Sequence, residues 1–196
     1  RKVKMHIDKK IWIDVETTGF SATKNDIWQI AILLDVNREL VSKEVFNFQP
    51  ADWDSISDKA LEVTGMDREK LKTFSPLSIA VPLVIKYLQE CVDHGPDSVL
   101  GVFSGHNTEF DWKFVRAFLE KHTRERMEDF FVIDFPIDTK KIAKDLELVK
   151  KKLISDHKLQ TLTEYYKVEH KAHDALSDIL ATREIYYLMG GHIDKS

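Results

Sequence analysis

The chain has 196 residues, of which 43% are hydrophobic and 32% are charged, and its formal net charge is −4. This length fits one domain with a full core, and the absence of any apolar run of about 18 residues excludes a helical membrane span. Cys91 is the only cysteine, which excludes intrachain disulfides and cysteine-rich zinc sites and fits a reducing, cytoplasmic compartment.

We expect a single domain over residues 1–196, with its core at about residues 10–187. No repeat, low-complexity stretch or linker rich in Pro, Gly or Ser divides the sequence. The first residues lack the apolar core of a secretory signal. Met5 is taken as the natural start, and residues 1–4 as an addition or an unordered extension. The acidic net charge does not indicate nucleic-acid binding, but local basic patches are sufficient for such binding.

Strand-like segments come first along the chain, and later ones alternate with helices. The first segment is apolar, the second is rich in Ile, and the third alternates between apolar and polar residues. The expected strands are residues 9–15, 26–36, 41–48, 97–104 and 130–134.

Apolar residues at helical spacing follow the first strands. In the segment 108–121, for example, Phe110, Phe114 and Phe118 fall on one side of a helix. Pro82 is expected to kink or shorten the helix in which it lies. This order of elements predicts an α/β or α+β sheet protein. The expected helices are residues 58–63, 67–73, 77–92, 108–121, 138–146, 159–166 and 174–188.

Two carboxylates stand at the end of the first strand, at Asp14 and Glu16. Because residues i and i+2 of a strand point to the same face, these side chains should project together. Unpaired like charges this close raise each other's pKa, and a divalent cation such as Mg²⁺ or Mn²⁺ relieves the repulsion. A solvated surface pair is the alternative interpretation. The apolar run before the pair and the turn Thr17-Thr18-Gly19 after it favour the metal site.

Asp111 falls in the first turn of the helix that is expected to begin near Thr108. It would lie at the sheet edge from which Asp14 and Glu16 project. A purely structural interpretation is also open, because an acidic residue in the first turn complements the helix dipole.

A histidine and a further aspartate come near the C-terminus. Asp178 lies one turn inside the last expected helix and His173 lies just ahead of that helix, so both can face one cavity. His173 can titrate near neutral pH, as a general base must, although a surface histidine in a polar loop is the alternative. His170 lies a further turn's worth of chain away and is expected to be structural or exposed.

In their order and local context, these residues resemble the catalytic motifs of the DEDDh exonucleases. That group contains polymerase proofreading subunits, ribonuclease T and oligoribonuclease. A sister group carries a tyrosine four residues before the last aspartate, whereas here a histidine lies five residues before it. The resemblance covers roughly residues 10–187 and implies a ribonuclease H-like α/β fold, a mixed β-sheet flanked by α-helices. The motifs that carry it are Asp14-Val15-Glu16-Thr17-Thr18-Gly19, His106-Asn107 with Phe110-Asp111, and Ala172-His173-Asp174-Ala175-Leu176 with Asp178.

The resemblance implies a metal-dependent 3′–5′ exonuclease that releases nucleoside 5′-monophosphates. Asp14, Glu16, Asp111 and Asp178 would hold two Mg²⁺ or Mn²⁺ ions, which clamp the attacking and leaving oxygens of an in-line displacement. His173 would accept a proton from the attacking water.

The resemblance also suggests how the substrate is held. The backbone around Thr17 and Thr18 would recognise the terminal 3′-hydroxyl, and Asn107 would touch sugar or phosphate. Phe20, where the family often has Leu, would stack on the last base; a core aromatic is the alternative. Lys150, Lys151 and Lys152 would form a patch that follows the phosphates, unless they are only a solvated face.

We expect single-stranded 3′ ends as the substrate, DNA rather than RNA, together with a polymerase or other nucleic-acid-processing partner and no membrane. One alternative is an RNA-trimming exoribonuclease, because a single 2′-OH contact often decides between the two substrates. A non-catalytic nucleic-acid-binding module of the same fold is a second, although all five catalytic positions are filled. An endonuclease of ribonuclease H or resolvase type is a third, but His173 and the Thr-Thr-Gly turn favour the exonuclease.

Overall fold

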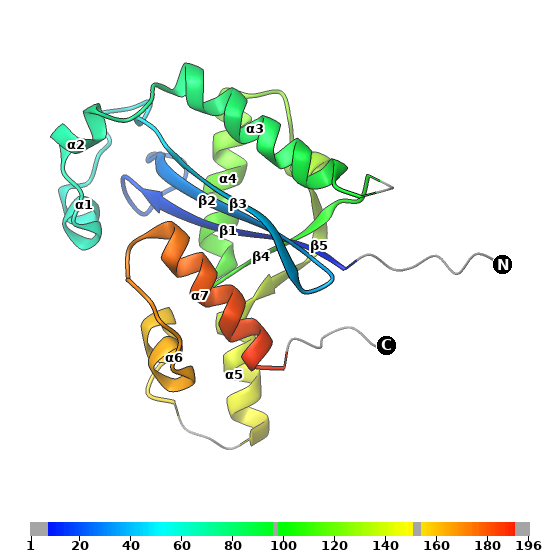
Figure 1. The fold of residues 1–196 in the computed structure, drawn as a ribbon. Coiled ribbons are helices and arrows are strands. Elements are labelled where there is room, and N and C mark those ends of the chain that lie inside the picture. The colour runs from blue at the N-terminus through cyan, green and yellow to red at the C-terminus, as the bar shows by residue number, and fades with distance from the viewer. Residues whose placement is uncertain (1–7, 96–97, 151–153, 191–196) are drawn as a thin grey trace.

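The computed structural model describes residues 8–95, 98–150 and 154–190, without the side chains of residues 148–150 (Figure 1). The expectation about residues 1–4 and Met5 lies outside the described residues. The three lysines expected to follow the phosphates are also affected, because Lys151, Lys152 and the side chain of Lys150 lie outside the described residues.

The strands of the described chain form one mixed sheet in the order β3-β2-β1-β4-β5. β1, β2 and β3 are antiparallel neighbours, whereas β4 runs parallel to β1 and β5 runs parallel to β4. This confirms the mixed sheet that the resemblance implied. The strands are β1 (Lys9–Thr17), β2 (Ile27–Val36), β3 (Glu39–Asn47), β4 (Gly101–Gly105) and β5 (Phe131–Asp138).

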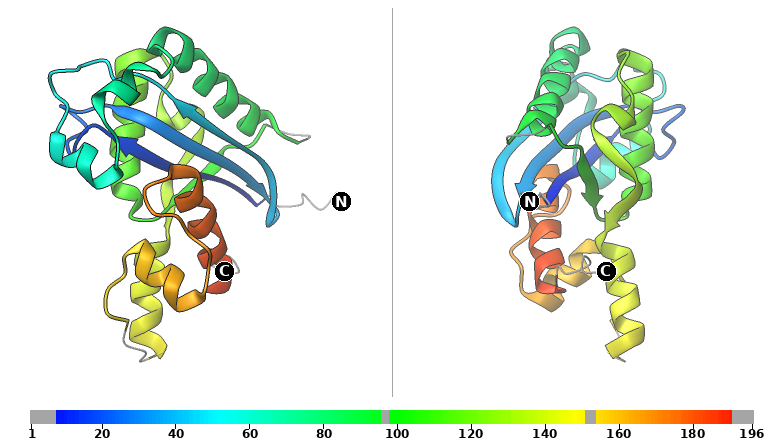
Figure 2. Two further views of the ribbon diagram at one scale, coloured as in Figure 1. Left: turned by 60° about the vertical axis from the view of Figure 1, so that its left-hand side comes forward. Right: turned by 90° about the vertical axis from the view of Figure 1, so that its right-hand side faces the viewer.

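Helices cover both faces of this sheet. α3 and α4 pack on one face, α7 packs on the other, and α5 and α6 continue on the side of α7 (Figures 1 and 2). Among the described residues, no helix combines the length and the apolar composition that crossing a bilayer requires. The helices are α1 (Asp58–Thr64), α2 (Arg68–Lys72), α3 (Leu77–Asp93), α4 (Thr108–His122), α5 (Thr139–Lys150), α6 (Leu159–Tyr166) and α7 (Ala175–Leu188), with a short 3₁₀ turn at Met127–Asp129.

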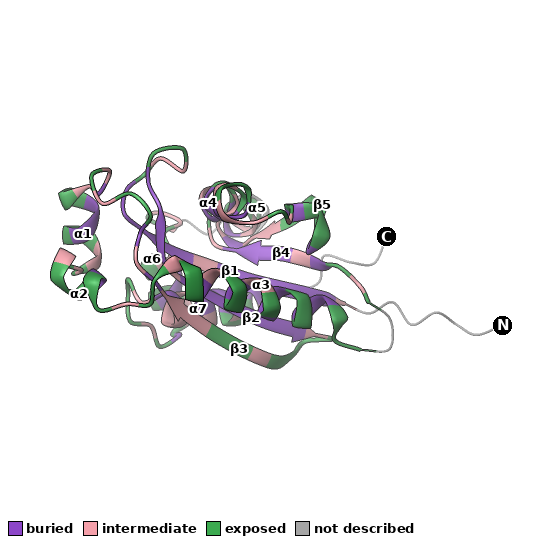
Figure 3. Cartoon of the chain, turned by 90° about the horizontal axis from the view of Figure 1, so that it is seen from above, coloured by how far each residue is buried: buried purple, intermediate pink, exposed green. Residues whose placement is uncertain are grey.

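The pleat of β1 sorts its side chains between the two faces. Ile11, Ile13 and Val15 belong to the core beneath α3 and α4, whereas Trp12 packs against α7 and lies edge-to-face with Tyr186, 5.2 Å between ring centres. Figure 3 shows this buried strand between the exposed outer surfaces of the helices. Because alternate residues share a face, the even-numbered positions that follow Trp12 also turn toward α7.

Several element boundaries differ from the expectation. β5 continues to Asp138 because its last residues pair with the end of β4, Ser104 with Ile137 and Gly105 with Asp138. β4 itself begins only at Gly101, since the Val99 N–H donates to the carbonyl of Val92 instead. α3 runs through Pro82 to Asp93 and is not shortened, because a proline in the second turn removes only one helical hydrogen bond.

Candidate active site

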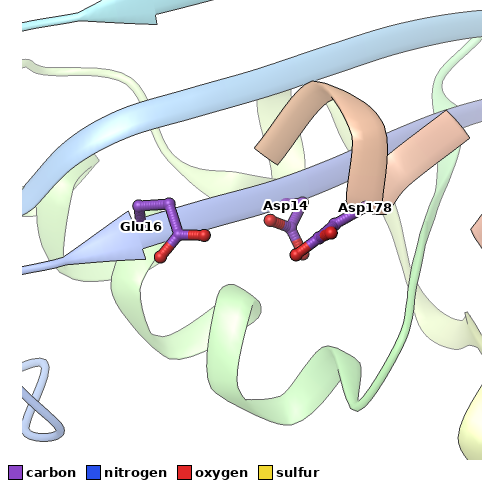
Figure 4. Close-up of side chains that lie close together, drawn as sticks. All are labelled: Asp14, Glu16 and Asp178. Atoms are coloured by element: carbon purple, nitrogen blue, oxygen red, sulfur yellow. The ribbon is translucent and has the colours of Figure 1, made fainter. Parts of the chain in front are cut away.

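Three carboxylates that the sequence singled out meet above the end of β1. Asp14, Glu16 and Asp178 each offer an oxygen, and these oxygens all lie within 4.8 Å of one another. Figure 4 shows the carboxylates of Asp14 and Asp178 side by side, with Glu16 farther along the strand. Glu16 is buried, and the other two are half-buried. The i, i+2 spacing therefore places both strand carboxylates on the face that α7 covers.

Capping and a sheet contact fix the position of Asp178. The side chain of Asp174, the N-cap of α7, accepts a hydrogen bond from the Ser177 N–H at 3.0 Å. The Ala175 N–H donates to Oε1 of Gln29 in β2 at 3.1 Å. These two bonds satisfy N–H groups that every helix start leaves without a partner. The first turn of α7, which carries Asp178, is thereby attached to the sheet.

The backbone passes close to β1 at Gly105, the last residue of β4. A Cβ on Gly105 would lie 3.0 Å from the carbonyl oxygen of Ile13, so the close approach of the two strands favours glycine there. Asn107, the N-cap of α4, has a left-handed backbone with φ of 62°. Its N–H donates to Oδ1 of Asp138 at 2.9 Å, and its side-chain oxygen accepts from Nζ of Lys140 at 3.3 Å. Asn107 is therefore held between the start of α4 and the start of α5.

Asp111 reaches β1 from the first turn of α4, as predicted. Its Oδ1 accepts a hydrogen bond from the Val15 N–H at 3.0 Å, and the residue is buried. Pairing between β1 and β4 ends at Trp12 and Ser104, so the carboxylate takes a position along β1 beyond the last paired residue of β4. It does not belong to the group of three oxygens, but it bonds to the backbone of Val15, the residue between Asp14 and Glu16 in β1.

The protein holds these acids at raised pKa values. Burial raises the pKa of Asp14 well above its ordinary value, and the charges of Asp111, Asp178 and Glu16 add to the shift. Burial, followed by the charges of Asp178 and Asp174, raises the pKa of Glu16 to about 8. Burial also raises the pKa of Asp111, against the hydrogen bond from Val15.

Such a cluster fits a divalent cation. Its donors are hard carboxylate oxygens gathered in one place, which is the donor set that Mg²⁺ and Mn²⁺ prefer. A bound cation would favour the ionised acids and displace the protons that burial otherwise retains.

The two neighbouring histidines relate to Asp178 in different ways. The side chain of His173 is exposed, its φ is 63°, and its backbone N–H donates to Oδ2 of Asp178 at 3.2 Å. The His170 ring donates from Nε2 to Oδ1 of Asp178 at 2.6 Å and is only 7% exposed. The expectation that His170 is merely structural or exposed thus missed a direct contact with the acidic cluster. The spacing of eight residues between His170 and Asp178 does not predict that contact.

Thr18 is bonded within the chain on every side. Its N–H donates to the carbonyl of Asp26 at 2.8 Å, and its hydroxyl accepts from the Asp26 N–H at 2.9 Å. Its carbonyl accepts from the Ser57 N–H at 2.8 Å, and the residue is fully buried. Thr18 therefore ties the turn after β1 to the segment that leads into α1.

The same turn presents an aromatic ring to solvent. The Thr17 hydroxyl donates to the carbonyl of Gly19 at 2.7 Å. Gly19 packs directly on the side chain of Asn25, where a Cβ would collide. Phe20 follows and is 66% exposed, so the alternative that it is a core aromatic is wrong. The turn is held at its base by a hydrogen bond and close packing, and it exposes an apolar ring at its tip.

Comparisons with known proteins agree with this geometry. The RNase_T family model, described as an exonuclease, matches residues 11–186. Ribonuclease T of Histophilus somni (strain 129Pt) is 29% identical over 195 residues, covering 93% of this chain and 84% of that protein. The PolC-type DNA polymerase III of Streptococcus pneumoniae (strain ATCC BAA-255 / R6) is 30% identical over 192 residues, covering 95% of this chain but 12% of the polymerase.

A solved structure shows the same fold at lower sequence identity. E. coli exonuclease I in complex with a dT13 oligonucleotide superposes with a TM-score of 0.77 at 19% identity. The superposition covers 92% of this chain and 40% of exonuclease I, so the chain corresponds to less than half of that protein. The family model spans nearly the whole sequence, and the chain has the expected fold and acidic residues. The chain therefore belongs to the RNase_T exonuclease family, a family of 3′–5′ exonucleases of the DEDDh type.

Proposed function

We propose that this exonuclease removes nucleotides from the 3′ end of single-stranded DNA and releases nucleoside 5′-monophosphates. The observation that carries the proposal is the convergence of Asp14, Glu16 and Asp178 within 4.8 Å. The exposed ring of Phe20 on the turn that follows β1 supports an end-binding site next to it. The dT13 oligonucleotide bound by exonuclease I supports DNA as the substrate.

The carboxylates would hold two Mg²⁺ or Mn²⁺ ions. Asp14 would contribute to both sites, Glu16 and Asp178 would complete one, and Asp111 would serve the other. Bound ions would supply Lewis-acid stabilisation of the charge that develops on the attacking and leaving oxygens. Asp111 already gives one oxygen to the Val15 N–H, so its other oxygen is the one available for this task.

His173 is assigned the role of general base. Its side chain is exposed to water, and the hydrogen bond from its backbone N–H to Asp178 keeps the residue next to the acidic cluster. An imidazole nitrogen would take the proton from the attacking water and return it to solvent. General bases of this kind contribute roughly 10²- to 10⁴-fold to the rate.

The substrate end would be held by the turn after β1. The backbone around Thr17 and Thr18 would contact the 3′-hydroxyl, with Thr18 mainly holding the turn in place because its own groups are bonded internally. Phe20 would stack on the terminal base, and Asn107 would touch sugar or phosphate. Lys150, Lys151 and Lys152 would follow the phosphates farther along the strand.

RNA is the second candidate substrate. The relative that aligns over 84% of its own length carries the name ribonuclease T. The similarity to PolC-type polymerases supports a polymerase, or another nucleic-acid-processing protein, as the partner.

Matched substrates test the choice between DNA and RNA. The chain would be incubated with Mg²⁺ and two 3′-labelled oligonucleotides of one sequence, one of DNA and one of RNA, with Asp14→Asn as the inactive control. We expect kcat/KM to be higher for the DNA oligonucleotide. Faster trimming of the RNA would replace the DNA assignment with the exoribonuclease. An equal rate with Asp14→Asn would attribute the activity to a contaminant and overturn the proposal.

A further inference from the structure

We infer that His170 is a positioning residue that holds the carboxylate of Asp178 in the orientation that binds a divalent cation. The inference rests on the acidic centre of the proposed function and adds a residue to it. His170 does not touch the reacting atoms; it acts through Asp178.

The contact between the two side chains is short and shielded from water. Nε2 of His170 lies 2.6 Å from Oδ1 of Asp178, and the two side chains are 7% and 14% exposed. A hydrogen bond to a carboxylate is among the stronger ones that proteins make, and shielding from water strengthens it further. The Asp178 side chain therefore cannot turn away from the cluster without losing this bond.

The second oxygen of Asp178 is held as well. The His173 N–H donates to Oδ2 at 3.2 Å, from a residue with a left-handed backbone and a φ of 63°. A carboxylate has about four lone-pair positions on its two oxygens. Two donors fix its plane and leave the remaining lone pairs for a cation shared with Asp14 and Glu16.

The histidine is itself supported from behind. Nδ1 of His170 lies 3.5 Å from Oγ1 of Thr163, which is buried in α6 and donates to the carbonyl of Gln160 at 2.7 Å. The next residue, Lys171, donates its N–H to the Ser177 hydroxyl at 2.8 Å. The ring is thus placed between α6 and the start of α7 by packing on one side and backbone bonding on the other. Partners of this kind orient metal ligands, and their loss typically costs about 10- to 100-fold in metal affinity or activity.

The two histidines therefore have separate tasks. A general base needs a ring nitrogen that is free to meet water, and the exposed ring of His173 satisfies this requirement. The ring of His170 is shielded and already bonded to Asp178 through Nε2. Loss of His170 should weaken metal binding, whereas loss of His173 should slow the reaction at saturating metal.

A pair of nearly isosteric variants tests the assignment. His170→Gln keeps an N–H donor near the place of Nε2, and His170→Met has a similar length but no donor. Mn²⁺ binding to the full chain would be measured by electron paramagnetic resonance without any substrate, with exposed His94→Gln as the matched control. We expect the Met variant to bind Mn²⁺ roughly 10- to 100-fold more weakly. The Gln variant should stay within a few-fold of the wild type, and His94→Gln should match it.

Equal Mn²⁺ affinity in the Met variant and the wild type would overturn the inference, as would equal losses in the Gln and Met variants. If the Met variant does not fold, nitrogen-15 NMR of the His170 ring replaces it. Asp178→Asn should then shift the His170 signal and leave the His94 signal in place, and an unmoved His170 signal would also overturn the inference. If metal binding depends on His170 but the chain releases no nucleotides, the proposed function is refuted and the inference about His170 stands.

Discussion

Replacing Glu16 with Gln should stabilise the metal-free protein. Burial and two neighbouring acids raise the pKa of Glu16 from 4.5 to about 8. A raised folded-state pKa gives stability that is fully present below pH 4.5 and is lost as the pH rises toward 8. At pH 7 the folded chain keeps a proton that the unfolded chain releases. At about 1.4 kcal/mol for each pH unit above the ordinary pKa, this costs about 3 kcal/mol. Gln keeps the shape of the side chain and avoids that cost.

The assay is thermal unfolding in EDTA at several pH values. About 3 kcal/mol corresponds to a rise in Tm of roughly 6–12 °C for a chain of this size. Variant and wild type should unfold together at pH 4.5 and diverge as the pH rises. Added Mg²⁺ should reverse the order, since the wild type gains a ligand-bound state that the variant binds poorly. A variant that is less stable than the wild type at pH 7 in EDTA would show that Glu16 is not held protonated at a cost, as would wild-type stability that rises from pH 5 to 8.

Four further predictions concern activity and substrate binding. Asp14→Asn should keep the fold by circular dichroism and lose nearly all nucleotide release, because one carboxylate of the acidic cluster is gone. His173→Ala should lower kcat by roughly 10²- to 10⁴-fold while its Mn²⁺ affinity, measured by paramagnetic resonance, stays unchanged. Phe20→Ala should weaken binding of a 3′ end, measured by fluorescence anisotropy, by about 1–3 kcal/mol through lost stacking. Changing Lys150, Lys151 and Lys152 to Ala should reduce the slope of the logarithm of the binding constant against the logarithm of the salt concentration by about 0.7 for each lost phosphate contact. An unchanged slope would show that these lysines do not contact the substrate.

The parts of the site that follow from local periodicity could be predicted from the sequence. Alternation along a strand placed Asp14 and Glu16 on one face, and this holds because the antiparallel pairing of β1 with β2 continues through both residues. Helical phase placed Asp111 and Asp178 in the first turns of α4 and α7. In each case the acidic residue lies within, or in the first turn of, an element that its own residue pattern predicts.

The contacts that depend on tertiary path could not be predicted in this way. His170 meets Asp178 only because the loop between α6 and α7 folds back over the start of α7. The internal bonding of Thr18 depends on Asp26, at the end of the following loop, and on Ser57, which is remote in the chain. The extension of β5 to Asp138 follows from its pairing with β4 rather than from its own composition, which includes an exposed Phe135 and a proline. No spacing within a single segment encodes these contacts.

End-labelled substrates test whether the cluster of Asp14, Glu16 and Asp178 removes nucleotides from the 3′ end. One single-stranded oligonucleotide would be labelled at its 3′ end and another at its 5′ end, and both would be incubated with the protein and Mg²⁺. The 3′ label should appear at once as a mononucleotide, while the 5′-labelled oligonucleotide should shorten step by step. Both reactions should stop in EDTA. Mid-sized fragments from either label would show cleavage within the strand instead, and release that continues in EDTA would exclude a metal-dependent 3′–5′ exonuclease.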